Sequence, residues 1–441
     1  MLARYDVVGP RYTSYPTVPV WRDDFDADDH VLALQRAATH PEAPLSVYMH
    51  VPFCEKLCHY CGCNVIVAKN RAKADPYLDA MRTEIELVAR HLGGRRQVSQ
   101  VHWGGGTPTF LDIARIEQLW GHLRAHFDLT EDAEVSVEIN PVTTSLAQLE
   151  ALRRLGFNRI SLGVQDLDPR VQEAIGRHQT VEQTVEALEF SRGLGFKSVN
   201  FDLIYGLPHQ DIHTWAETLD GVIQLQPDRI AVYSFAWLPQ LRPHQARIDG
   251  DALPTGRAKL DLLRQAWKAF ATAGYVPIGM DHFARPDDEL AQAQVQGRLW
   301  RNFQGYTVQS AQDSIAFGVS AISDVGGAYA QNVRTLPKYY EAIGQGRLPT
   351  VRGMHLSPED ERRRTLITQL MCNLNVSLDE GERRHFANAL AALKPLVADG
   401  LVEPTAAGLR VTDLGRIFLR NVAMPFDEYL PGSQHRFSRT V

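Results

Sequence analysis

Cysteine is scarce in this sequence outside one short stretch. The chain has 441 residues and five cysteines, and four of them lie within the ten residues CEKLCHYCGC, at Cys54, Cys58, Cys61 and Cys63. The fifth, Cys372, lies in an apolar helix-like segment, where we interpret it as a core residue. Such a distribution argues against a disulfide-stabilised secreted domain, and in a reducing compartment a local cysteine cluster more often holds a metal.

Long apolar runs and an excess of basic charge are also missing. No stretch of 18 or more apolar residues occurs, so we expect no membrane span, and the charged N-terminal residues do not resemble a secretory signal. We therefore predict a cytoplasmic location. The net charge of −6 argues against nucleic-acid binding, and without a visible heptad repeat we expect a monomer.

Short β-branched or aromatic runs alternate with longer helix-like segments through the middle of the chain. This alternation is typical of strand–helix–strand units and a parallel sheet. Six units predict a sheet that closes partly, as an incomplete (β/α)6 barrel, although an open doubly wound sheet also fits the pattern. The expected strands are 45–51, 98–103, 135–139, 159–164, 199–204 and 230–235, with a further apolar run at 275–280.

Two of the intervening helices carry recognisable start signals. Asp75 precedes Pro76, which predicts an Asp75 cap and a helix over 77–92. Thr180 and Gln183 have the spacing of a capping box, which predicts a helix over 181–194.

The residues before the β/α series differ from it in composition. The segment PRYTSYPT, residues 10–17, is rich in proline and hydroxyl groups and predicts an extended arm. We expect residues 1–44 to form this arm over the active site and residues 45–345 to form the catalytic barrel and its extension.

The pattern becomes helical after the barrel. We interpret residues 346–441 as a mainly helical, winged-helix-like C-terminal domain with a helix starting at Leu414. Its helices are expected at 357–372 and 379–398, and its two short strands at 400–404 and 408–412.

The four clustered cysteines have the spacing C-x3-C-x2-C-x-C and follow the first predicted strand. Ligands gather in loops at the carboxyl ends of parallel strands, and thiolates suit zinc, copper(I) or iron–sulfur clusters. A disulfide pair and a four-cysteine zinc site stay open, although structural zinc usually takes its ligands from two chain segments. A four-iron cluster on Cys54, Cys58 and Cys61 would leave one iron open, as a catalytic site needs.

Polar groups and glycines follow the later strands at matching depths. Gly104, Gly105 and Gly106 come directly after the second strand, where their backbone could approach a ligand. Glu138 lies near a strand end on the face opposite the apolar residues, so it binds either a ligand or a structural partner. Arg177 could meet a carboxylate or be a solvated loop residue.

Several segments resemble known families. The C-x3-C-x2-C spacing resembles the signature of radical S-adenosylmethionine (SAM) enzymes, and the three glycines resemble the motif with which that family meets the amino group of SAM. Longer segments are similar to oxygen-independent coproporphyrinogen III oxidases almost end to end. They are PRYTSYPT (10–17), CHYCGCN (58–64), HWGGGTPT (102–109), GMDHFARP (279–286) and RNFQGY (301–306).

This resemblance implies an anaerobic oxidoreductase of haem and porphyrin biosynthesis with one [4Fe-4S] cluster and two SAM molecules. A 5′-deoxyadenosyl radical would take the β-hydrogen of a propionate, and two propionates of coproporphyrinogen III would become the vinyl groups of protoporphyrinogen IX. An unidentified electron donor and acceptor are also implied. The alternative is a haem-trafficking or haem-modifying relative, against which the N-terminal arm and Cys63 argue.

The resemblance also assigns residues. It makes Cys54, Cys58 and Cys61 the cluster ligands and Cys63 a neighbour that need not bind iron, and it assigns no catalytic residue beyond the cluster and SAM sites. Cluster-bound SAM would contact Tyr48, Gly105, Glu138 and Ile322. A second SAM would contact Tyr60 (where the family commonly has phenylalanine), Gly106, Thr107, Gln165, Arg177, Asp202 and Ala236. Arg11, Arg242 and Arg301 are candidates for binding the substrate carboxylates.

Overall fold

The computed structural model describes residues 2–308, 313–430 and 437–440, which form two compact units. The larger unit comprises Arg22–Ala269 and Ala311–His355. The smaller unit comprises Met1–Trp21, Phe270–Ser310 and Leu356–Val441. The domain boundaries expected after residues 44 and 345 stay a prediction. Within the described residues, no helix is long and apolar enough to cross a membrane.

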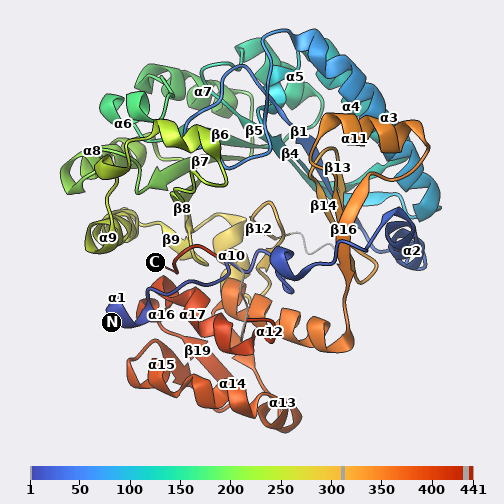
Figure 1. Ribbon diagram of the computed structural model, residues 1–441. Helices are drawn as coiled ribbons and strands as arrows, with labels where there is room; N and C mark the ends of the chain where they lie inside the picture. The colour runs from blue at the N-terminus through green and yellow to red at the C-terminus, as the bar shows by residue number, and fades with distance from the viewer. Residues whose placement is uncertain (1, 309–312, 431–436, 441) are drawn as a thin grey trace. The chain divides into compact units, whose positions relative to one another are not determined.

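A parallel sheet is the centre of the larger unit, and all six strands expected from the sequence are confirmed (Figure 1). They are β1 (Leu45–Val51), β4 (Gln97–Gly105), β5 (Asp128–Ile139), β6 (Arg159–Gln165), β7 (Ser198–Tyr205) and β8 (Arg229–Ser234), each parallel to the next. Their burial is nearly continuous, as expected of strands covered on both faces.

The sheet continues beyond β1 instead of closing. There β13 (Asp313–Phe317) runs parallel to β1, and β14 (Ile322–Val325), β15 (Ala328–Asn332) and β16 (Thr350–His355) follow antiparallel. The strand order is β16-β15-β14-β13-β1-β4-β5-β6-β7-β8, and the six parallel strands follow one another in chain order. A doubly wound sheet would reverse this order, so the topology is that of the predicted incomplete barrel.

Helices connect the parallel strands and lie outside the sheet (Figure 1). The capping box at Thr180 is confirmed at the start of α7. The cap expected at Asp75 is wrong: Ala74 takes the cap position of α3, and the Asp75 carboxylate accepts a hydrogen bond from Arg115 Nε at 2.6 Å. The connecting helices are α3 (Asp75–Leu92), α4 (Ile113–His126), α5 (Leu146–Arg154), α6 (Pro169–Ala174), α7 (Val181–Gly193), α8 (Ile212–Leu225) and α9 (Gly256–Thr272).

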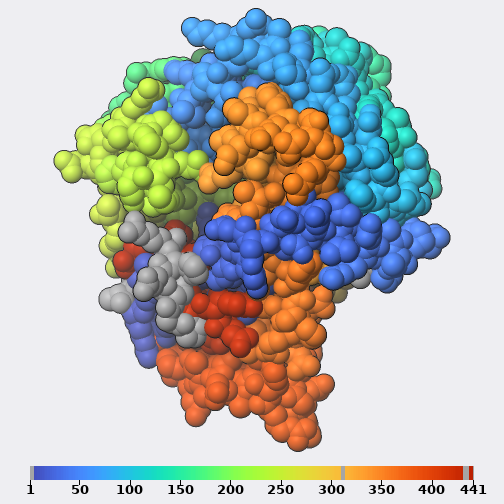
Figure 2. All heavy atoms as spheres, turned by 45° about the vertical axis from the view of Figure 1, so that its right-hand side comes forward, coloured from blue at the N-terminus to red at the C-terminus, as the bar shows by residue number. Residues whose placement is uncertain are grey.

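Two further helices, α2 (Ala27–Ala37) and α11 (Leu336–Gly344), pack against α3, and Figure 2 shows the orange α11 against the blue α3. Buried Glu84 of α3 accepts hydrogen bonds from the Tyr339 hydroxyl of α11 (2.5 Å) and from the Gly318 amide (2.8 Å). Burial raises the pKa of Glu84 to about 7. This contact fixes the turn after β13, which leads into β14 and Ile322.

The smaller unit contains the C-terminal helices and a small antiparallel sheet, as expected of a winged-helix-like domain. Tyr5, Tyr12 and Tyr15 of the N-terminal segment are buried in its core, and Cys372 is buried there too, which confirms its core role. Its elements are α1 (Leu2–Tyr5), β9 (Val276–Ile278), β10 (His282–Ala284), α10 (Glu289–Val295), β11 (Trp300–Arg301), β12 (Tyr306–Thr307), α12 (Pro358–Asn373), β17 (Asn375–Ser377), α13 (Glu380–His385), α14 (Ala387–Ala392), α15 (Lys394–Ala398), β18 (Val402–Pro404), β19 (Gly408–Val411), α16 (Asp413–Ile417) and α17 (Leu419–Ala423).

Candidate active site

The clustered cysteines lie on a loop that directly follows β1. Cys54 ends the short strand β2 (Phe53–Cys54), which pairs in parallel with β3 (Ile66–Val67). The loop between these strands carries Cys58, Cys61 and Cys63. Cys54, Cys58 and Cys61 are half-buried, whereas Cys63 is exposed.

Other parts of the larger unit hold this loop through its backbone. His59 donates from its amide to the Ile175 carbonyl at 2.8 Å and from Nδ1 to the Ala174 carbonyl at 3.2 Å. From the segment after β8, His244 Nε2 donates to the Cys61 carbonyl at 2.8 Å and Gln245 Nε2 donates to the Tyr60 carbonyl at 3.1 Å. Four hydrogen bonds to backbone groups and to the His59 ring therefore position the loop.

The thiols have different acidities. Burial raises the pKa of Cys54 to about 11, against the opposing effect of Thr107, whose hydroxyl lies 3.4 Å from the sulfur. A hydrogen bond from Cys63 lowers the pKa of Cys61 to about 7 and raises that of Cys63 well above its usual value. The Cys61 and Cys63 thiols thus interact with each other, and the division of the four cysteines into three ligands and one neighbour stays a prediction.

The cysteine loop offers donors of the kind that an iron–sulfur cluster takes. Among the residues that the structure describes, no three His, Cys, Asp or Glu side chains converge where one metal ion could be held. A [4Fe-4S] cluster binds its cysteines on separate irons, so its thiolates line a space instead of meeting at one point. Three half-buried cysteines on one loop supply thiolates of the kind that such a cluster takes.

The glycine turn after β4 lies against the cysteine loop. Gly105 has φ +114°, and a Cβ there would lie 2.6 Å from the His50 ring. A Cβ on Gly106 would lie 2.7 Å from the backbone of Pro52 and Phe53, which lead into Cys54. Only glycine lets these two backbones approach so closely.

Gly106→Ala should therefore displace the cysteine loop. The new methyl group would overlap backbone atoms, which cannot rotate away as a side chain can, so we expect a cost of about 1–3 kcal/mol and lower iron retention after reconstitution. Iron content and thermal unfolding would measure both effects. Gly121→Ala is the matched control, since a Cβ there meets nothing within 4 Å; equal iron contents in the two variants would contradict the prediction.

Glu138 lies near the end of β5 beside the glycine turn. Its carboxylate accepts hydrogen bonds from His102 Nε2 and from the Gly105 amide, both at 3.2 Å. Although burial opposes the charge, these donors hold the pKa of Glu138 below its usual value. The Tyr48 ring stacks on the His102 ring at 5.9 Å. Because the Glu138 side chain is 43% exposed, part of its carboxylate can still meet a ligand.

Arg177 is buried, so its interpretation as a solvated loop residue is wrong. It donates to Gln179 Oε1 at 3.0 Å, to Asn140 Oδ1 at 3.1 Å and to the Gly163 carbonyl at 2.5 Å. The side chain of Gln165 lies against the same glycine, since a Cβ on Gly163 would be 2.7 Å from Gln165 Nε2 and 3.1 Å from Arg177 Nη2. Arg177 also interacts with Cys58, which places it beside the cysteine loop.

The remaining predicted contacts come from three separate elements. Asp202 of β7 accepts hydrogen bonds from Ser161 Oγ at 3.0 Å and Asn200 Nδ2 at 2.9 Å. Ala236 follows β8, and Gln245 Nε2 donates to its carbonyl at 3.3 Å as well as to that of Tyr60. Ile322 begins β14. The structure thus brings together Tyr48 with Glu138, Cys54 with Thr107 and Tyr60 with Ala236.

Sequence reasoning missed the residues that support the site. His102 orients Glu138 and stacks on Tyr48, and its polar side chain inside an otherwise apolar strand was a usable signal. Gln245 and His244 were not identifiable, because they lie in a short 3-10 helix (Pro243–Arg247) and act on the cysteine loop about 180 residues earlier.

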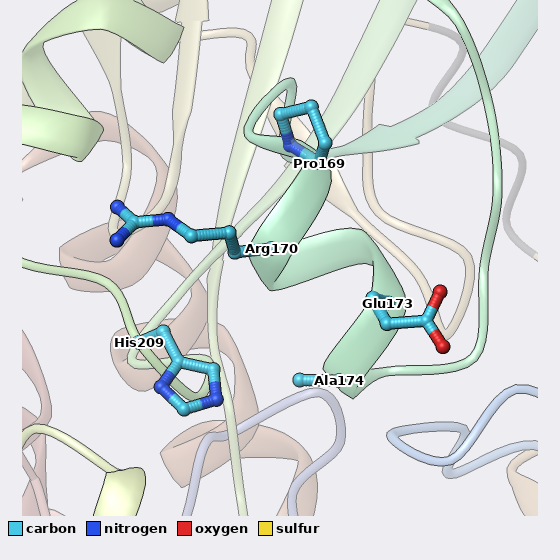
Figure 3. A pocket seen from close by; sticks show the side chains of 5 residues that line it. All are labelled: Pro169, Arg170, Glu173, Ala174 and His209. Atoms are coloured by element: carbon cyan, nitrogen blue, oxygen red, sulfur yellow. The ribbon is translucent and has the colours of Figure 1, made fainter.

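A shallow surface depression of about 490 Å³ lies beside α6 and is lined by Pro169, Arg170, Glu173, Ala174 and His209 (Figure 3). Arg170 and His209 lie on one side of the helix, and Glu173 points to the other. The charged side chains Arg170 and Glu173 are 69% and 77% exposed. We assign this depression no part in the site.

Comparisons with known proteins agree with this geometry. Residues 48–222 match the Radical SAM superfamily, and residues 356–418 match the HemN C-terminal domain. The chain is 44% identical over 453 residues to the oxygen-independent coproporphyrinogen III oxidase of Pseudomonas aeruginosa and 45% identical over 450 residues to that of Escherichia coli K12, in each case covering 100% of this chain and 98% of the relative.

A solved structure of a coproporphyrinogen III oxidase is also similar to this chain. The radical SAM enzyme coproporphyrinogen III oxidase (HemN) from Escherichia coli superposes with a TM-score of 0.91 at 45% identity, covering 95% of this chain and 98% of the other. The fold class expected from the sequence is thereby confirmed. Membership implies a [4Fe-4S] cluster and SAM. The chain belongs to the oxygen-independent coproporphyrinogen III oxidase family of radical SAM enzymes.

Proposed function

We propose that this enzyme converts two propionates of coproporphyrinogen III to vinyl groups and so forms protoporphyrinogen IX without oxygen. In each conversion the propionate loses one hydrogen atom, one electron and carbon dioxide, and these losses balance the new carbon–carbon double bond. The observation that carries the proposal is the arrangement of three half-buried thiols beside the Gly105–Gly106 turn and Glu138.

Cys54, Cys58 and Cys61 would hold the cluster, and Tyr48, Gly105, Glu138 and Ile322 would hold the SAM bound to it. When bound, the cluster and SAM supply the organic radical that takes the propionate β-hydrogen. The ionised Glu138 suits the ammonium group of SAM, because a carboxylate forms its stronger hydrogen bonds with charged donors. The stacked Tyr48 and His102 rings form one wall beside it.

A second SAM would bind to the residues around Arg177. The proposed contacts are Tyr60, Gly106, Thr107, Gln165, Arg177, Asp202 and Ala236. Two observations support a polar binding region there. Arg177 is buried and donates to amide and carbonyl oxygens, and the Asp202 carboxylate accepts hydrogen bonds from Ser161 and Asn200.

The reaction also needs partners of two kinds. One electron per turnover must reach the cluster from a donor, and the electron lost by each propionate must pass to an acceptor. We propose a monomer in the cytoplasm that receives coproporphyrinogen III as a small-molecule substrate, with the N-terminal arm closing over it. Exclusion of water by such an arm would protect a reactive intermediate.

Anaerobic reconstitution tests the proposal directly. Protein loaded with iron and sulfide, then given a reductant, SAM and coproporphyrinogen III, should yield a product lighter by two carbon dioxides and four hydrogens per tetrapyrrole, measured by mass. A methylating or haem-opening enzyme would leave the propionates intact, and a haem-trafficking protein would bind haem without forming vinyl product. Either result would overturn the proposal.

A further inference from the structure

Three segments that the cluster and SAM sites do not use meet in the smaller unit. They are PRYTSYPT (10–17), GMDHFARP (279–286) and RNFQGY (301–306), and the first and last residues of this set are nearly 300 positions apart in the sequence. Arg11 comes from the first, Asp281 and His282 from the second, and Arg301 and Tyr306 from the third. Side chains from all three surround the carboxylate of Asp281.

Asp281 is buried, with only 6% of its side chain exposed. His282 Nδ1 donates to its Oδ1 at 2.7 Å, while Arg11 Nη2 lies 3.9 Å from its Oδ2. Although burial opposes the charge, His282, Arg301 and Arg11 hold the pKa of Asp281 well below its usual range. One carboxylate thus faces two arginines and a histidine, which leaves the group with an excess of positive charge.

The second and third segments are tightly interlocked. The guanidinium of Arg301 lies over the Tyr306 ring at 4.7 Å and donates to the Tyr306 hydroxyl at 3.0 Å. That hydroxyl accepts from the Met280 amide at 3.1 Å, and a Cβ on Gly279 (φ +55°) would lie 1.9 Å from it. Arg301 is therefore held rigidly, and a rigid cation loses little entropy when it binds an anion.

Arg11 differs from its neighbours because it keeps binding capacity. Its side chain is 40% exposed, and its contact with Asp281 is longer than a hydrogen bond. No hydrogen bond joins its guanidinium to another residue in the described part of the chain. The neighbouring Tyr12 fixes the backbone, since its buried hydroxyl donates to Asp427 at 3.0 Å. Arg11 thus presents a planar donor group from a fixed backbone.

We propose that Arg11, oriented by Asp281 and accompanied by His282 and Arg301, binds a propionate carboxylate of the tetrapyrrole substrate. A guanidinium binds a carboxylate through two parallel hydrogen bonds, which an ammonium cannot do. A substrate with four carboxylates also needs local cations on a chain of net charge −6. The proposal rests on the proposed function and names a binding site for its substrate.

The test is the affinity of the cluster-loaded enzyme for coproporphyrin III, the stable oxidised form of the substrate, followed by porphyrin fluorescence. Arg11→Gln should raise the dissociation constant about tenfold or more, because a charge-assisted pair is lost. Arg11→Lys should give an intermediate value. Deleting the arm would be a poorer test, since it would remove Tyr12 and Tyr15 from the core.

The matched control is Arg285→Gln. Arg285 lies in the same segment as Asp281, is 44% exposed, and pairs with Asp287. The affinity of the Arg285→Gln variant for coproporphyrin III should therefore stay at the wild-type value. Unchanged binding in Arg11→Gln, or an equal loss in Arg285→Gln, would overturn the inference. Because binding is measured without turnover, a specific loss in Arg11→Gln would support it even if no vinyl product formed and the decarboxylation proposal failed.

Discussion

Replacing any one of Cys54, Cys58 and Cys61 with alanine should abolish the formation of 5′-deoxyadenosine. The three thiols come from one loop whose backbone is held by His59, His244 and Gln245, so the loop should keep its position while the cluster loses one of only three ligands. Iron and sulfide content, visible absorbance and 5′-deoxyadenosine measured by mass would check this.

Cys63→Ser is the matched control, because it changes a fourth thiol on the same loop. Cys63 is exposed and donates a hydrogen bond to Cys61, which a serine hydroxyl can also do. The variant should therefore keep its cluster and its SAM cleavage. Loss of the cluster in Cys63→Ser would return all four cysteines to the ligand set, and activity surviving in any of the three alanine variants would refute that ligand's assignment.

Glu138→Gln should weaken SAM binding on the order of 100-fold. The substitution removes the negative charge opposite the ammonium group, worth about 1.5–3 kcal/mol in a charge-assisted hydrogen bond. In the wild type, the Gly105 amide and His102 both donate to the Glu138 carboxylate. A glutamine at this position can turn its own amide N–H group toward these two donors, which repel it. Equilibrium binding of SAM to the reconstituted enzyme would measure the loss, while iron content should not change.

The pH dependence of the wild type sharpens this test. Because the pKa of Glu138 is lowered, the carboxylate stays ionised from pH 8 down to pH 6, and SAM affinity should not fall through its protonation in that range.

Glu134→Gln is a suitable control for Glu138→Gln, since Glu134 lies on the same strand but accepts from Gln100 and Arg159 instead. Equal SAM affinity in Glu138→Gln and the wild type would remove Glu138 from the site.

The sequence by itself determined the β/α order and the strand positions, and it predicted the three-plus-one division of the cysteines. Strands are encoded locally by β-branched runs such as 45–51 and 199–204, which stay buried in any arrangement of a parallel sheet. Ligand spacing is local as well, because Cys54, Cys58 and Cys61 share one loop. The family resemblance added a predicted reaction and predicted contacts for the cluster and for SAM. The cysteine and Glu138 variants can test these contacts.

Only the tertiary structure decided how distant residues are paired. Arg177 is buried against Gln179 and Asn140. The Asp75 carboxylate accepts a hydrogen bond from Arg115 instead of capping a helix, and Arg11 lies beside Asp281. Such pairs are set by which elements pack together, whereas local patterns report only neighbours a few residues apart along a helix or strand. For this reason a ligand set among the cysteines could be predicted from the sequence, whereas the supporting histidines and the Asp281 cluster could not.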